Sequence, residues 1–194
     1  GRRQFRRRRL VGWWRHVRGR WRLGGLVMAG TMRRLFAHLF TGDAQGRFPE
    51  ADMQRIAAAI ADGEARHRGE VCFAVEGALD WRDVLRGVQA RTRALDAFAQ
   101  LRVWDTAANN GVLVYLLLAD HRIEIVADRG LRGRVGDEQW RGVCLLMEER
   151  LRAGEYTDAV VDAIAAASAL LAAHFPQAPG GMDEDELPNA PVFL

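Results

Sequence analysis

Short apolar segments at residues 70–76, 111–119 and 122–127 predict three β-strands. They are rich in branched aliphatic and aromatic residues and are bounded by glycine or polar turn residues, a pattern typical of strands. Residues 111–119 are almost uniformly apolar, so both faces of this strand are expected to be covered. The polar pair Asp120-His121 separates it from the next strand and predicts a β-hairpin.

Longer segments carry apolar residues at every third or fourth position, which is the period of an amphipathic helix. The four segments with this pattern are residues 49–66, 81–101, 137–152 and 157–175. Pro49 suits the first turn of the first helix, and Gly154 suits the end of the third. The stripe expected to be buried in the second helix consists of Val84, Leu85, Val88, Leu95 and Phe98.

The order of elements is α-β-α-β-β-α-α, and a strand–helix–strand unit in one sheet normally makes a right-handed crossover. Helices can then cover both faces of a small mixed sheet. The sequence therefore predicts an α/β fold, a three-layer α/β/α sandwich. The domain is expected to span residues 49–175, after a short amphipathic lead-in at 32–48 and before a disordered acidic tail at 176–194.

Positive charge is concentrated at the start of the chain. Residues 1–31 contain ten arginines and no acid, so the rest is net acidic although the whole chain has a charge of +3. We favour a non-native extension ahead of a start at Met32. The alternatives are binding to nucleic acid or to an anionic membrane surface. The residues that would make these contacts are Arg6, Arg7, Arg8, Arg9, Trp13 and Trp14.

Cysteine usage and hydropathy favour a cytoplasmic protein. Cys72 and Cys144 fall within predicted core elements, which indicates reduced thiols. The longest apolar run, residues 112–119, is far shorter than the roughly 20 residues of a membrane span, so no transmembrane segment is expected. The five histidines are scattered at surface-like positions and do not form a ligand set.

The spacing of Cys144 and Arg150 matches that of cysteine phosphatases, in which the five intervening residues form a loop around phosphate. Here those residues are helix formers, include two glutamates and lack glycine. The sequence therefore predicts that Cys144 is a core residue of a helix.

Oxygen-rich side chains flank the hairpin at its open end. Because the start of one antiparallel strand lies beside the end of the next, these side chains are expected to meet at one edge of the sheet. Carboxylate and amide oxygens are the ligands of Ca²⁺ and Mg²⁺, whereas turn and cap chemistry explains the same residue types without an ion. The candidate metal ligands are Asp105, Asn109, Asn110, Asp128 and Asp137.

Four short motifs lie within this hairpin or next to it in the sequence. They are Val103-Trp104-Asp105-Thr106, Asn109-Asn110-Gly111-Val112-Leu113, Arg122-Ile123-Glu124-Ile125 and Asp128-Arg129-Gly130-Leu131. Together they resemble the TPM domain, the family shared by a thylakoid lumen protein and a photosystem II repair factor. The resemblance covers residues 49–175 and implies an α/β/α sandwich. Ala127-Asp128-Arg129 departs from the family pattern, which usually has a glycine there.

Some members of that family are described as acid phosphatases and others as calcium-binding proteins. The resemblance therefore carries Asp105, Asn110 and Asp128 over as contacts for an ion or a phosphate. Many relatives have a signal peptide and a membrane anchor or glycine-rich tail, neither of which is expected here.

Three functional hypotheses follow. The first is a TPM-like domain that binds Ca²⁺ or Mg²⁺ and acts as an accessory protein in envelope maintenance, with a protein partner at a membrane or envelope complex. The second is a metal-assisted acid phosphatase in which Asp105 or Asp128 acts as nucleophile or base. The third is binding through the arginine-rich N-terminus, for which nucleic acid is the less expected partner.

Overall fold

A four-stranded mixed sheet lies at the centre of the computed structural model, which describes residues 24–177 and 186–194. The strands lie in the order β3-β2-β1-β4, with β1 parallel to both β2 and β4, and β2 antiparallel to β3. The strands are β1 (Val71–Glu76), β2 (Val112–Leu117), β3 (Arg122–Ala127) and β4 (Val192–Phe193). The helices are α1 (Gly24–Phe40), α2 (Ala44–Arg47), α3 (Glu50–Glu64), α4 (Trp81–Leu85), α5 (Ala90–Gln100), the 3-10 helix η1 (Arg129–Leu131), α6 (Asp137–Ala153) and α7 (Tyr156–His174).

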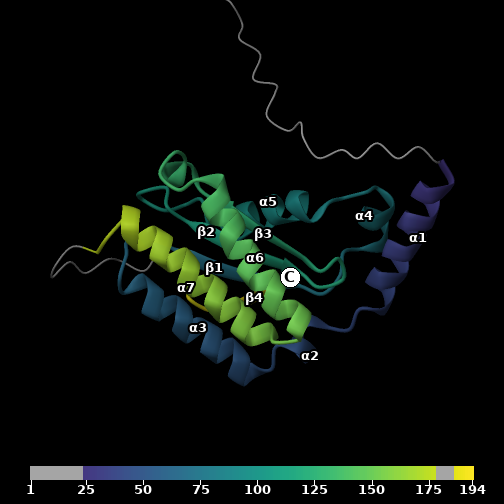
Figure 1. The fold of residues 1–194 in the computed structure, drawn as a ribbon, viewed down its shortest axis with the longest axis horizontal. Coiled ribbons are helices and arrows are strands. Elements are labelled where there is room, and N and C mark those ends of the chain that lie inside the picture. The colour runs from purple at the N-terminus through teal and green to yellow at the C-terminus, as the bar shows by residue number, and fades with distance from the viewer. Residues whose placement is uncertain (1–23, 178–185) are drawn as a thin grey trace, which may run out of the picture.

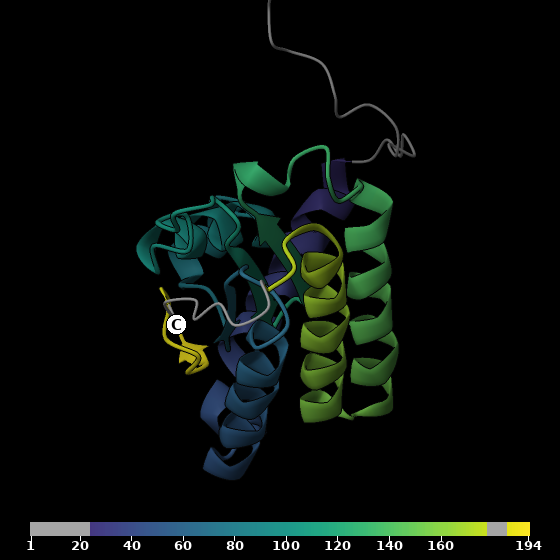
Figure 2. The ribbon, with the colours of Figure 1, turned by 90° about the vertical axis from the view of Figure 1, so that its left-hand side faces the viewer.

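Helices cover both faces of this sheet (Figure 1). Figure 2 shows α3, α7 and α6 side by side on one face, with α4 and α5 on the opposite side. The predicted three-layer α/β/α sandwich is therefore confirmed.

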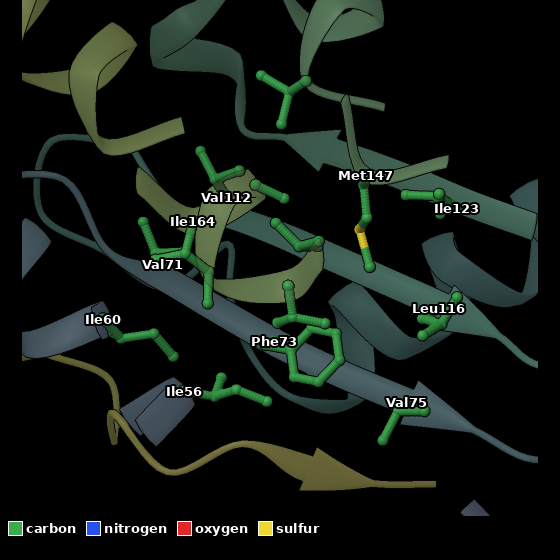
Figure 3. Close-up of a cluster of buried hydrophobic side chains, with 14 of the residues drawn as sticks. Ile56, Ile60, Val71, Phe73, Val75, Val112, Leu116, Ile123, Met147 and Ile164 are labelled. Atoms are coloured by element: carbon green, nitrogen blue, oxygen red, sulfur yellow. The ribbon is translucent and has the colours of Figure 1, made fainter. Parts of the chain in front are cut away.

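The central strand β2 contributes to the hydrophobic core on each face of the sheet. All six of its residues are buried, as the uninterrupted apolar run predicts. Figure 3 shows Val112 and Leu116 in the core beneath α3, α6 and α7, together with Phe73, Met147 and Ile164. The alternate side chains of β2 pack toward α4 and α5.

One helix among the described residues, α7, is long and apolar enough to cross a membrane, with a mean hydropathy of 1.4. It packs between α3 and α6, as Figure 1 shows, and its buried face includes Val160, Ile164 and Leu171. Its apolar character is therefore explained by its place in the core of the sandwich.

The segment predicted as one helix over residues 81–101 forms two helices. Gly87, at φ +74°, lies between α4 and α5, and this left-handed conformation interrupts the helical path. The face that α5 buries consists of Ala90, Ala94 and Ala97, whereas Leu85 and Leu95 are about half exposed. The predicted stripe was wrong at those two leucines because it assumed one continuous helix through Gly87.

The end of the chain also differs from expectation. Residues 186–194 return to the sheet, where Val192 pairs with Ala74 and Phe193 with Val75, and the Leu194 N–H donates to the Val75 carbonyl at 3.0 Å. The prediction of a disordered tail was wrong for residues 186–194. The acidic residues before them dominate the composition of the segment, but its short apolar end forms β4 on the edge of β1. Residues 178–185 lie outside the described structure.

The N-terminal helix α1 begins at Gly24, upstream of the expected lead-in at residues 32–48. It lies at one end of the molecule (Figure 1) and contacts α4. The arginine and tryptophan residues at positions 6–9, 13 and 14, proposed to bind nucleic acid or a membrane, lie outside the described residues.

Candidate functional site

The open end of the β2–β3 hairpin is held together by close backbone contacts. The Asp128 N–H donates to the Gly111 carbonyl at 2.9 Å, and the Gly130 N–H donates to the Asn109 carbonyl at 2.9 Å. A Cβ atom at Gly111 would lie 2.0 Å from the Val103 carbonyl oxygen, and one at Gly130 would lie 2.5 Å from two carbonyl oxygens. Only glycine allows these approaches, of which the one at Gly111 is to the segment before β2 and the one at Gly130 brings residues 128–130 beside residues 108–109.

We call Asn109, Asn110 and Asp128 the open-end cluster. The antiparallel register, in which Val112 pairs with Ala127, places these residues at one edge of the sheet, as the sequence indicates. Asn109 adopts a left-handed conformation at φ +52°, which asparagine tolerates better than most residues. Its Oδ1 accepts a hydrogen bond from Arg129 Nε at 2.7 Å, so this oxygen already has a partner.

Asn110 is fully buried at this edge. Its backbone N–H donates to Thr106 Oγ1 at 3.1 Å, and its side-chain amide nitrogen donates to the Arg68 carbonyl. The second of these bonds fixes the orientation of the side-chain amide. Its Oδ1 is buried and has no hydrogen-bond partner among the described residues.

Asp128 is in a similar position. Its Oδ1 accepts from the Arg129 backbone N–H at 2.6 Å and caps η1. Its Oδ2 is buried and likewise has no hydrogen-bond partner in the described part of the chain. Two of the three residues of the open-end cluster therefore each present one buried oxygen without a partner.

The other two predicted ligands are not joined to this cluster. The Asp105 carboxylate is exposed and forms an ion pair with Arg102. Asp137 is an exposed residue in the first turn of α6, where Gly136 is the N-cap and Gln139 accepts from the Gly136 N–H at 2.9 Å. Within residues 24–177 and 186–194, no group of three or more His, Cys, Asp or Glu side chains could hold a metal ion.

Residues that the sequence did not single out support the open end. The Glu186 carboxylate accepts from the Ala107 N–H, at 2.8 Å to Oε2, and so ties the C-terminal segment to the loop before β2. The Leu187 N–H donates to Glu70 Oε2 at 3.3 Å. Glu186 belongs to an acidic stretch of the sequence, and no local pattern indicates this long-range contact.

The opposite end of the hairpin holds α1 through an ion pair that the sequence did not predict. Asp120, in the hairpin turn, accepts from Arg34 at 2.7 Å and from His38 Nε2 at 3.1 Å. His38 is buried, contrary to the surface position expected of the histidines, and its Nδ1 accepts from the Leu79 N–H at 3.0 Å. Burial alone would raise the pKa of Asp120, but the hydrogen bonds from Arg34 and His38 outweigh it and lower that pKa.

A second buried carboxylate lies on the sheet face covered by α5. Glu76 accepts from Tyr115 Oη at 2.5 Å and from Arg93 Nε at 2.8 Å. Burial and the hydrogen bond to Glu76 raise the pKa of Tyr115 well above its ordinary value. Because each of these polar groups has a partner, this cluster is accounted for as structural.

A groove of about 710 Å³ lies at the turn end of the hairpin, away from the open-end cluster. Its walls include Asp120, Glu148, Arg152 and Tyr156. Asp120 is bound by Arg34, and Arg152 donates to Glu148 at 2.7 Å. Since these charged groups already have partners, the groove gives weaker support for a ligand site than the open end does.

The cysteines have no arrangement for phosphate chemistry. Cys144 lies within α6, so the residues between it and Arg150 are helical and form no phosphate loop, as predicted. Both thiols are free, and burial raises the pKa of Cys72 to about 12 and that of Cys144 to about 11. Neither is a reactive thiolate near neutral pH.

Comparisons with known proteins agree with this fold. A sequence model of the TPM domain matches residues 42–170. The solution structure of the BA42 protein from the psychrophilic bacterium Bizionia argentinensis is similar, with 28% identity and a TM-score of 0.65 over 74% of this chain and 92% of that one.

The N-terminal domain of a protein from P. gingivalis shares the fold at 17% identity, with a TM-score of 0.55 over 75% of this chain and 89% of that one. A search of curated proteins finds no match.

Proposed function

The chain belongs to the TPM domain family. We propose that it binds a divalent cation, Ca²⁺ or Mg²⁺, at the open end of the β2–β3 hairpin. The observation that carries the proposal is the pair of buried oxygens without hydrogen-bond partners, Asn110 Oδ1 and Asp128 Oδ2. Asn110 directly precedes Gly111, and the Gly111 carbonyl accepts from the Asp128 N–H across the open end of the hairpin.

The energetic argument starts from the cost of these two atoms. Leaving a buried polar group unsatisfied costs on the order of 1–3 kcal/mol, and more when the group is charged. A hard cation offsets this cost because both atoms are oxygens of the types that Ca²⁺ and Mg²⁺ prefer. Asp128 would supply the charge and Asn110 a neutral oxygen.

The composition of the site predicts modest affinity. Asn109 Oδ1 is occupied by Arg129, and Asp105 is occupied by Arg102. Asp128 is then the one carboxylate of the proposed ligand set, and the remaining ligands would be carbonyl oxygens and water. Because affinity for Ca²⁺ rises with the number of charged ligands, we expect a Kd on the order of 10⁻⁴ to 10⁻³ M.

The test is the thermal midpoint of the full chain in EDTA, in Ca²⁺ and in Mg²⁺. At a hundredfold excess of ion over Kd the folded state gains about 2.7 kcal/mol, which corresponds to a rise of roughly 5–10 °C. Asp128→Asn should abolish the rise. This variant keeps an oxygen that can cap Arg129, so its own fold should be preserved.

Asp137→Asn is the matched control, since it removes an exposed carboxylate that the structure does not join to the cluster. It should leave the rise unchanged. If neither ion shifts the midpoint of the wild-type protein, the two oxygens are satisfied by bound water and the proposal is wrong.

The biological role that we propose for such a domain is that of an accessory protein with a protein partner at a membrane or envelope complex. Support comes from the resemblance to the TPM domain family, whose sequence model matches residues 42–170. A bound ion that stabilises the open end of the hairpin, without hydrolysis of a substrate, is consistent with a protein that binds a partner.

A metal-assisted phosphatase is the second candidate, and Arg129 is the observation that favours it. This arginine is exposed directly beside Asp128, where its guanidinium could neutralise a phosphate ester. Hydrolysis would transfer the phosphoryl group to water and release the alcohol. The test is hydrolysis of p-nitrophenyl phosphate with each ion. Turnover that is lost in Asp128→Asn and kept in Asp137→Asn would favour the phosphatase.

A further inference from the structure

Helix α1 packs on the domain through Leu35, Arg34 and His38, whereas a second set of its apolar residues faces outward. An ordinary surface helix turns polar residues outward instead. Its inner face is fixed by polar contacts: Arg34 binds Asp120 and the Val88 carbonyl, and His38 binds Asp120 and the Leu79 N–H. These directional bonds determine which side of the helix faces the domain.

The outer side, which we call the apolar face of α1, consists of Met32, Phe36, Leu39 and Phe40. These residues recur at intervals of three and four and are 50–79% exposed. Phe36 and Phe40 stack on one another, with ring centroids 6.1 Å apart. Single exposed apolar side chains are ordinary, but a continuous stripe with two phenylalanines indicates a surface that another body covers.

Charge around this face identifies the kind of partner. Residues 1–42 contain arginine as their only fully charged residue type, and the first acid in the chain is Asp43. Arg33 is exposed on α1 itself, next to the apolar face. An apolar stripe beside an exposed arginine, in a stretch of sequence that is rich in arginine and free of acids, is typical of helices that lie in the interface of an anionic bilayer.

We propose that the apolar face of α1 docks onto an anionic lipid bilayer, with the phenylalanines inserted among the acyl chains and Arg33 bound to a lipid phosphate. A second copy of the chain is a poorer occupant, because residues 1–42 contain no acid that could pair with Arg33 of the other copy. Nucleic acid is also poorer, since the aliphatic Met32 and Leu39 contribute nothing to base stacking. This docking is independent of the cation site, which lies at the other end of the hairpin.

The test is flotation of the full chain with vesicles of phosphatidylcholine alone and of phosphatidylcholine mixed with phosphatidylglycerol. We expect binding about tenfold or more tighter to the anionic vesicles, weakened by salt. The double variant Phe36→Ser with Phe40→Ser keeps every charge and should lose about tenfold or more of this affinity. The control Leu95→Ser with Leu145→Ser removes two comparably exposed leucines on α5 and α6 and should bind as the wild type does.

Each other outcome overturns the proposal. No preference for anionic vesicles, or equal binding by the wild type and the phenylalanine variant, would exclude insertion of this face. Concentration-dependent dimerisation that the phenylalanine variant abolishes would identify a second copy as the occupant. Binding of duplex DNA that needs the phenylalanines would assign the face to nucleic acid. If the phenylalanine variant fails to fold, Met32→Ser with Leu39→Ser tests the same face.

Discussion

The glycines at the open end of the hairpin give a graded test of the geometry described above. In Gly130→Ala the new Cβ would lie 2.5 Å from the carbonyl oxygens of Ala108 and Asn109, and in Gly111→Ala 2.0 Å from that of Val103, whereas ordinary contacts lie at 3.4–4 Å. The opposing atoms are backbone, so they cannot rotate away. We expect Gly130→Ala to lower the free energy of unfolding by about 1–3 kcal/mol and Gly111→Ala by about 3 kcal/mol or more.

Gly142→Ala is the matched control because it makes the same chemical change with no atom within 4 Å of the new methyl group. Gly142 lies inside α6, so alanine should stabilise the protein by about 1 kcal/mol through helix propensity. Urea and thermal unfolding measure all three variants, with a shift of roughly 2–4 °C for each kcal/mol. A Gly130→Ala protein as stable as the wild type would refute the close approach, and a destabilised Gly142→Ala protein would show that alanine lowers stability here without a steric clash.

Two further predictions concern titratable groups. The lowered pKa of Asp120 means that its ion pair stabilises the fold at pH values above the ordinary aspartate pKa, and that this contribution is lost as pH falls through the lowered value. Asp120→Asn should therefore cost roughly 1–2 kcal/mol at pH 7 and reduce the loss of stability on acidification, as followed by urea unfolding from pH 7 downward. An unchanged acid sensitivity would mean that other carboxylates dominate. At pH 8 in the native protein, Cys72 should react with a thiol reagent more slowly than the half-buried Cys144, because Cys72 is accessible only when the protein unfolds. Absorbance under native and denaturing conditions measures both rates. Equal rates for the two thiols in the native protein would contradict the burial of Cys72.

The central architecture could be predicted from the sequence because periodicity records burial directly. The apolar run of β2 requires cover on both faces, and the Asp120-His121 turn fixes the pairing with β3. The approach of residues 109–111 to residues 128–130 follows from that register. The glycines of the open end are visible in the sequence, but the backbone contacts that require them are not.

The features missed by the sequence depend on contacts between distant segments. The strand at Val192 pairs with Ala74 across most of the chain, and two residues are too few for a periodic signal. The outward position of the apolar face of α1 depends on contacts with Asp120, which belongs to a turn and looks like ordinary turn chemistry. In each case a long-range polar or backbone contact overrides the local pattern.

The pairing of β4 with β1 has a consequence for solubility. β1 is an entirely buried strand of the sequence VCFAVE, with β2 on one side and the two residues of β4 on the other. A short apolar strand with an open edge is a template for intermolecular β-pairing. Residues 192–193 thus protect the edge of β1 from pairing with another molecule. Proteolytic removal of these residues should make the domain self-associate while it is still folded.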